Sequence, residues 1–105
     1  ANASAVRRQF ERDAAALAAS PGAFRMHFTT NHDWNSWEGT TAKRLGPAWA
    51  AATVLTFTLP GMPLIYSGQE AGLDEMLEFF EKDEIAWRDH PARELYTQLA
   101  RLKRE

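Results

Sequence analysis

Cysteine is absent from the chain of 105 residues, so no disulfide can form and no redox compartment is indicated. No apolar run approaches the roughly 20 residues of a membrane span, and no signal peptide is visible. An excess of one charge is also absent, because 12 Lys and Arg oppose 14 Asp and Glu. Without a basic surface we expect no nucleic-acid partner, and without a span no membrane partner. The localisation stays undetermined.

The hydrophobic pattern predicts a helix, a strand, a helix, a strand and a final helix. These elements are expected at residues 3–19, 23–30, 41–59, 62–66 and 91–105. Gly46 and Pro47 predict an irregular first turn in the middle helix. A helix between two strands indicates a right-handed crossover and parallel pairing. The connection 67–89 is unusually long, and residues 73–80 within it are candidates for a short helical turn.

The first predicted strand alternates in polarity, as a strand with two unlike faces does. Its two faces are Phe24, Met26 and Phe28 on one side, and Arg25, His27, Thr29 and Asn31 on the other. The polar face can lie in solvent, or it can line the inside of a barrel while the apolar face packs on helices. Periodicity does not separate these two interpretations.

Polar residues follow both predicted strands. The first strand runs into FTTNHD (residues 28–33), and the second lies within GMPLIYSGQE (residues 61–70). Polar side chains at the carboxyl ends of parallel strands form the active sites of (β/α)₈ barrels. Taken alone, Asp33 could simply be a carboxylate that ends a strand or caps a helix.

The pair of motifs resembles the seventh and eighth strands of the catalytic barrel of the α-amylase family of glycoside hydrolases (family 13). The matching residues are Phe28, Asn31, His32, Asp33, Gly61, Pro63, Ile65, Tyr66, Gly68 and Glu70. The resemblance implies an α/β fold: a partial TIM barrel made of a helix, two parallel strands and the helices that follow them. Residues 1–105 would be the C-terminal part of one catalytic barrel, with no second domain. A complete barrel needs roughly 250 residues, so this chain cannot close one.

The resemblance also implies roles for individual residues. Asp33 corresponds to the carboxylate that stabilises the oxocarbenium-like transition state, and His32 to a histidine that binds the same sugar. Trp34 is a candidate for stacking on sugar, whereas Trp37 is equally well explained by packing. Asn31 is a candidate for substrate binding together with His32 and Trp34. Asn is also common in turns at strand ends, so Asn31 could instead shape the turn.

The second motif is predicted to be structural. Its residues are Gly61, Pro63, Tyr66, Gly68 and Glu70. The glycines permit tight turns, and a structural ion pair is a better explanation of Glu70 than catalysis. No metal or other cofactor is assigned to this segment.

The expected function is part of a retaining α-glycosidase that acts on α-glucans or α-glucosides. The nucleophile and the acid/base belong to earlier strands in the family, so the chain should be inactive alone and need the remainder of the barrel. Hydrolysis and transglycosylation are not separable here. The alternative is a non-catalytic relative that serves as a binding or partner scaffold.

Two further expectations concern the chain itself. A metal-dependent phosphohydrolase built around His32 and Asp33 is disfavoured, because the chain has only 3 histidines and too few ligands near them. An isolated pair of strands leaves edges and an apolar face uncovered. We therefore expect the isolated chain to oligomerise, to be partly disordered or to depend on the remainder of the barrel.

Overall fold

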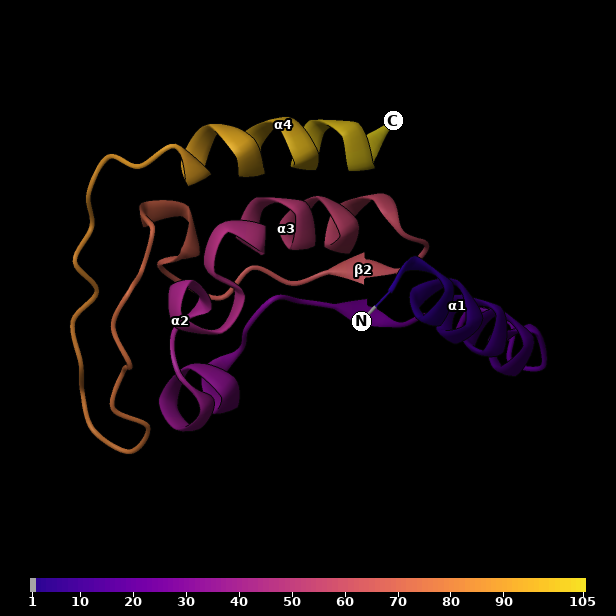
Figure 1. Ribbon diagram of the computed structural model, residues 1–105, viewed down its shortest axis with the longest axis horizontal. Helices are drawn as coiled ribbons and strands as arrows, with labels where there is room; N and C mark the ends of the chain where they lie inside the picture. Colours follow the sequence, from indigo (N-terminus) through magenta and orange to yellow (C-terminus); the bar gives the residue numbers. More distant parts are fainter. Residues whose placement is uncertain (1) are drawn as a thin grey trace.

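A computed structural model describes residues 2–105, which form a helix-rich α/β arrangement with one small parallel sheet (Figure 1). The elements are α1 (Ala3–Ala18), β1 (Met26–His27), η1 (Trp34–Glu38), α2 (Thr41–Leu45), η2 (Gly46–Ala48), α3 (Trp49–Thr58), β2 (Met62–Pro63), η3 (Gln69–Ala71) and α4 (Ala92–Arg104). The predicted order of helices and strands is confirmed. No helix within the described residues is long and apolar enough to cross a membrane.

The sheet consists of β1 and β2 in parallel, with Met26 opposite Met62 and His27 opposite Pro63. The Met62 backbone N–H donates to the Arg25 carbonyl at 2.8 Å, and the Leu64 N–H donates to the His27 carbonyl at 2.8 Å. The predicted parallel pair is therefore confirmed. Both strands are shorter than predicted, since each has one neighbour and pairs only over this short stretch.

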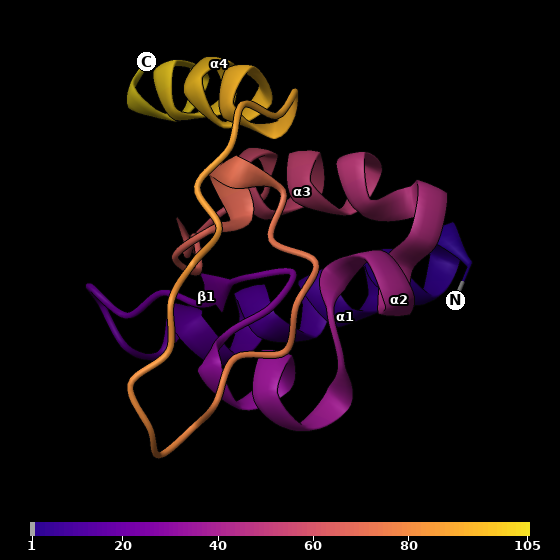
Figure 2. The ribbon, with the colours of Figure 1, turned by 90° about the vertical axis from the view of Figure 1, so that its left-hand side faces the viewer.

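The helix between the two strands is interrupted at Gly46 and Pro47, where the sequence predicted an irregular turn. Thr40 caps α2 by accepting a hydrogen bond from the Lys43 N–H at 3.2 Å. Gly46 then adopts φ 50°, a conformation that favours glycine, and η2 leads into α3. Residues 73–80 contain no helix, so the short turn considered there is wrong. The whole stretch from 73 to 90 runs along one end of the molecule as an irregular strap (Figure 2).

The core lies between α3 and α4. Phe57 meets Tyr96 at 6.0 Å between ring centroids, and Ala92 and Leu99 complete the buried cluster. Figures 1 and 2 show the resulting layers: α4 lies over α3, and α3 lies over the strands. Burial of these side chains is the main favourable contribution on this side of the sheet.

The two faces of β1 are not covered as the barrel interpretation predicts, with the polar face inside a barrel and the apolar face on helices. Thr29 is buried and accepts a hydrogen bond from Gln69 Nε2 at 2.7 Å, and His27 Nε2 bonds to the Pro60 carbonyl at 2.8 Å. Met26 and Met62, by contrast, are exposed. The expectation that the apolar face packs on helices is wrong. The polar residues lie among the covering elements because each finds a specific partner there.

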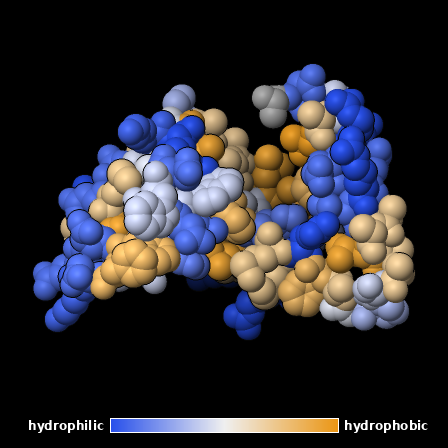
Figure 3. Space-filling view, turned by 90° about the horizontal axis from the view of Figure 1, so that it is seen from below, coloured by the Kyte–Doolittle hydropathy of each residue, from blue (hydrophilic) through white to orange (hydrophobic). Residues whose placement is uncertain are grey.

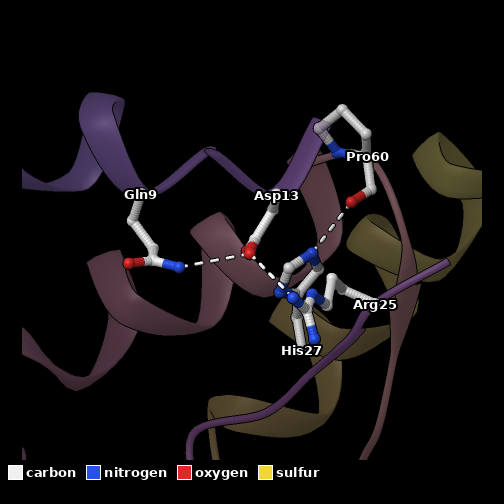
Figure 4. A network of polar contacts seen from close by, with 5 residues as sticks. All are labelled: Gln9, Asp13, Arg25, His27 and Pro60. Carbon is white, nitrogen blue, oxygen red and sulfur yellow. Dashed lines mark hydrogen bonds and ion pairs between the residues drawn. The ribbon is translucent and has the colours of Figure 1, made fainter. Parts of the chain in front are cut away.

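Helix α1 is attached mainly by side chains (Figure 4). Asp13 Oδ1 accepts hydrogen bonds from Arg25 Nη2 at 3.0 Å and from Gln9 Nε2 at 3.1 Å. The Phe10 ring lies 5.8 Å from the His27 ring. No residue of α1 is buried, and a hollow with hydrophobic side chains separates it from the rest of the molecule in Figure 3.

The pKa of Tyr96 provides a test of the core. Burial raises it above the usual 10.0, as does the charge of Glu70, while hydrogen bonding with Thr53 and Thr29 acts in the opposite direction. A raised pKa gives stability below the unfolded value that is lost as pH rises through the folded value. We expect the free energy of unfolding to fall as pH rises above about 10, and to fall less in Tyr96→Phe.

Urea titrations followed by circular dichroism between neutral pH and pH 11 measure this difference. Tyr66→Phe is the variant for comparison. Burial and the charge of Asp83 also raise the pKa of Tyr66, but Tyr66 lies outside the α3–α4 core. A pH dependence in Tyr96→Phe as steep as in the unaltered chain would show that Tyr96 is not protected by the core.

Candidate functional site

The polar end of β1 is shaped by Asn31. Its Oδ1 accepts a hydrogen bond from the Trp34 N–H at 2.9 Å, and its carbonyl accepts one from the Asn35 N–H at 2.9 Å. These two bonds turn the chain from the strand into η1. The structure thus gives Asn31 a local structural role, and its contact with substrate stays a prediction.

His32 and Asp33 form an open polar pair at this turn. His32 Nε2 lies 3.7 Å from Asp33 Oδ2, and their side chains are 68% and 59% exposed. Because solvent reaches both groups, their free nitrogen and oxygen atoms can bond to hydroxyl groups of a ligand. An exposed carboxylate of this kind can stabilise positive charge.

Trp34 is packed on more than one side. The Arg44 guanidinium lies 4.2 Å from its ring centroid, and Phe28 meets it edge-on at 5.4 Å. Arg44 is itself fixed, since Nη1 donates to the Thr29 carbonyl at 3.1 Å. Stacking of Trp34 on sugar stays a prediction. Trp37 is more open than Trp34, with 61% of it exposed against 41%.

The strap 73–90 is fastened to η1 by polar residues that sequence reasoning missed. Asn35 is only 1% exposed; it donates to the Glu75 carbonyl at 2.9 Å and accepts from the Leu77 N–H at 2.8 Å. Ser36 Oγ donates to the Leu77 carbonyl at 2.7 Å. An amide side chain can both donate to and accept from a peptide group. The only sign of this role in the sequence is that an amide residue, Asn35, follows closely after the FTTNHD motif.

Glu70 and Gln69 stabilise the end of the second motif. Glu70 Oε2 accepts a hydrogen bond from the Gly68 N–H at 3.0 Å, so its role is structural, though through a backbone bond and not the expected ion pair. Gln69 Oε1 accepts from the Tyr66 N–H at 2.8 Å, while Nε2 reaches Thr29 on the other strand. Gln69 therefore connects the ends of both strands, and sequence reasoning missed it.

The glycines of this motif are required by close approaches. Gly61 has φ 132°, and a Cβ there would lie 2.5 Å from the Arg25 carbonyl oxygen. Gly68 has φ 95°, and a Cβ there would lie 3.0 Å from Ile85 Cγ2. Pro63 has no N–H to contribute to the sheet, and the bonds to β1 come from its neighbours Met62 and Leu64.

A separate cavity of about 160 Å³ lies between the strap, α2, α3 and α4. Its polar lining includes Asp74, Arg88 and His90. Arg88 donates to the Ala71 and Gly72 carbonyls, and His90 Nδ1 accepts from the Ala92 N–H at 3.1 Å, so these groups are engaged in local structure. Asp33 is not part of this cavity.

Comparisons of the chain with protein-family models, with curated proteins and with solved structures found no match. Within residues 2–105, no group of three or more His, Asp or Glu side chains is arranged to hold a metal ion. The candidate site is therefore defined by its own geometry, with His32 and Asp33 at the end of β1 and the Gln69 contact joining it to the end of β2.

Loss of the Asn35 amide tests how the strap is held. We expect Asn35→Ala to speed amide hydrogen exchange of Leu77 by roughly tenfold or more, because a partly buried peptide group loses its partner. Nuclear magnetic resonance measures this exchange. Asn2→Ala removes the exposed cap of α1 and is the control that should leave Leu77 unchanged. Equal exchange in all three proteins would mean that Asn35 does not fasten the strap.

Proposed function

We propose that the chain is the C-terminal part of a catalytic (β/α)₈ barrel resembling those of the α-amylase family. The supporting observation is that two motifs of this family follow neighbouring parallel strands, whose ends are joined by the Thr29–Gln69 hydrogen bond at 2.7 Å. Active sites of such barrels lie beyond the carboxyl ends of the strands, and His32 and Asp33 lie in the turn that follows β1.

In this proposal Asp33 and His32 act on an α-glucan or α-glucoside. A retaining glycosidase forms a covalent glycosyl-enzyme through an oxocarbenium-like transition state. The open Asp33 carboxylate would bind hydroxyls of the reacting sugar and stabilise its developing positive charge. His32 would donate a hydrogen bond to the same sugar. Tyr66, Gly61 and Pro63 would position the second strand.

The remainder of the barrel would supply the nucleophile and the acid/base. Neither motif is present in residues 1–105, so the chain alone would be inactive. The outer edges of β1 and β2 carry no further strand in the described residues, and Met26 and Met62 are exposed on one face. A neighbouring strand and the side chains of a closed barrel would cover both features.

The alternative is a non-catalytic relative in which the same surface binds sugar or a protein partner. Retention of His32 and Asp33 together favours the catalytic proposal.

Replacement of Asp33 separates the two functions in the intact protein that carries residues 1–105. We expect Asp33→Asn to lower kcat for maltoheptaose by roughly 10²–10³-fold, since charge stabilisation of the transition state is lost. Asp89→Asn is the matched control, because Asp89 is fully exposed and lies 3.7 Å from Arg93 in an ion pair at the surface. Binding of maltoheptaose without turnover by the unaltered protein would support the scaffold. Absence of both binding and turnover would contradict the catalytic proposal and a sugar-binding scaffold alike.

Self-association tests the need for a covering partner. We expect the isolated chain to associate as its concentration rises, and the double variant Met26→Gln, Met62→Gln to associate less, because exposed apolar area drives such contacts. Sedimentation velocity measures this, with Leu102→Gln on the exposed side of α4 as control. A monodisperse monomer at all concentrations would show that the open sheet face needs no partner.

A further inference from the structure

Three aromatic side chains from two distant segments meet beside His32. The Trp37 and Phe79 ring centroids are 5.6 Å apart, those of Phe79 and Phe80 are 4.8 Å apart, and those of Trp37 and Phe80 are 6.5 Å apart. The His32 ring lies 5.7 Å from the Phe79 ring. These three aromatic residues, the aromatic platform, therefore adjoin the polar pair of the candidate site.

The aromatic platform is open to solvent. Trp37 is 61% exposed and Phe80 is 82% exposed. Aromatic side chains of this size are usually buried, because removing them from water is favourable. Where they are exposed in a group, they often serve in recognition. Figure 3 shows apolar and near-neutral side chains grouped among hydrophilic ones at the end of the molecule away from α1.

The segments that carry these rings are fixed. On one side, the hydrogen bonds of Asn35 and Ser36 with Glu75 and Leu77 join η1 to the strap. At the loop tip, the carboxylate of Asp83 accepts hydrogen bonds from the Glu78 N–H at 2.9 Å and the Glu84 N–H at 2.8 Å. The turn that contains Phe79 and Phe80 is therefore closed before any ligand binds, which limits the entropy lost on binding.

We propose that the aromatic platform stacks on a sugar ring of an α-linked oligosaccharide, next to the ring bound by His32 and Asp33. The identity of that first ring rests on the proposed function. The platform offers flat apolar faces for the C–H faces of a sugar, while His32 and Asp33 offer hydrogen bonds to its hydroxyls. The ligand of this site is then an oligosaccharide of at least two units.

A carbohydrate accounts for this surface better than a protein partner does. The strap beside the platform is rich in carboxylates, which accept hydrogen bonds from hydroxyl groups. Exposed carboxylates of the strap include Glu75, Glu78, Glu81 and Glu84. Asp74 already accepts a hydrogen bond from Thr40, and Asp83 closes the turn. The open sheet face at Met26 and Met62 is aliphatic instead, and it lies on β1 and β2 away from this loop tip.

Binding of two probes to the intact protein tests the proposal. The probes are methyl 1-thio-α-glucoside and a maltotriose with sulfur in both linkages, which resists hydrolysis. We expect Trp37→Ala and Phe80→Ala to raise the Kd of the thio-maltotriose roughly tenfold, on the scale of one aromatic stacking contact, and to leave the monosaccharide unchanged. Trp37→Phe keeps a flat ring and should restore most of the affinity, which a folding defect would not allow. Isothermal titration measures both constants.

Two control variants separate this proposal from the proposed function. Trp87→Ala removes another exposed aromatic outside the platform and should change neither Kd. Asp33→Ala should weaken both probes. If Asp33→Ala weakens both while Trp37→Ala and Phe80→Ala change nothing, the platform is overturned and the proposed function stands.

The remaining outcomes are equally decisive. If the platform variants weaken the thio-maltotriose and Asp33→Ala weakens neither probe, the stacking surface stands and the role of Asp33 falls. If the unaltered protein binds neither probe, the platform is overturned together with the sugar site. If Trp37→Ala instead causes an oligomer to dissociate, seen as a lower mass by sedimentation, the aromatic rings form a contact between protein chains. The proposal is then overturned.

Discussion

The parallel pairing of β1 with β2 is the constraint on which the rest of the structure depends. Two backbone hydrogen bonds of 2.8 Å set the register, and this register brings the residues that follow each strand to one edge of the sheet. Gly61 permits the approach, because any larger residue would collide with the Arg25 carbonyl. A shift of one residue would exchange the two faces of each strand and separate Thr29 from Gln69.

The two sides of this sheet are stabilised very differently. On one side, α3 and α4 bury Phe57 and Tyr96 and fix the crossover. On the other side, Met26 and Met62 stay exposed. Helix α1 contacts Arg25 and His27, which share the face of β1 opposite Met26. Such an imbalance is what a segment of a larger barrel would have, with its outer helix layer present and its interior side open.

Local patterns in the sequence predicted much of this fold, but not its tertiary details. Apolar spacing predicted the helices, and Gly46 with Pro47 predicted the break in the crossover, because both act through local backbone preferences. Alternation left two interpretations of the β1 faces open, because it does not say which face is covered. The structure matches neither, since Thr29 is buried and Met26 is exposed. The partners of His27, the Pro60 carbonyl and the Phe10 ring of α1, are distant in sequence and were not predicted.

The candidate site shows the same division. His32 and Asp33 were predicted from a motif, and the structure places them in solvent, in the helical turn between β1 and η1. The supports Asn35 and Gln69 were missed, because their partners lie about forty residues away in the sequence. The aromatic platform was missed for the same reason, as Trp37 and Phe80 come together only through the folded strap.

The measurement that tests the central claim most directly is the sequence of the coding DNA upstream of the Ala1 codon. The account predicts an open frame of roughly 250 or more residues, with earlier strands that end in a nucleophilic Asp and an acidic Glu. A start codon immediately before Ala1, or a longer frame without those two carboxylates, would contradict a catalytic barrel.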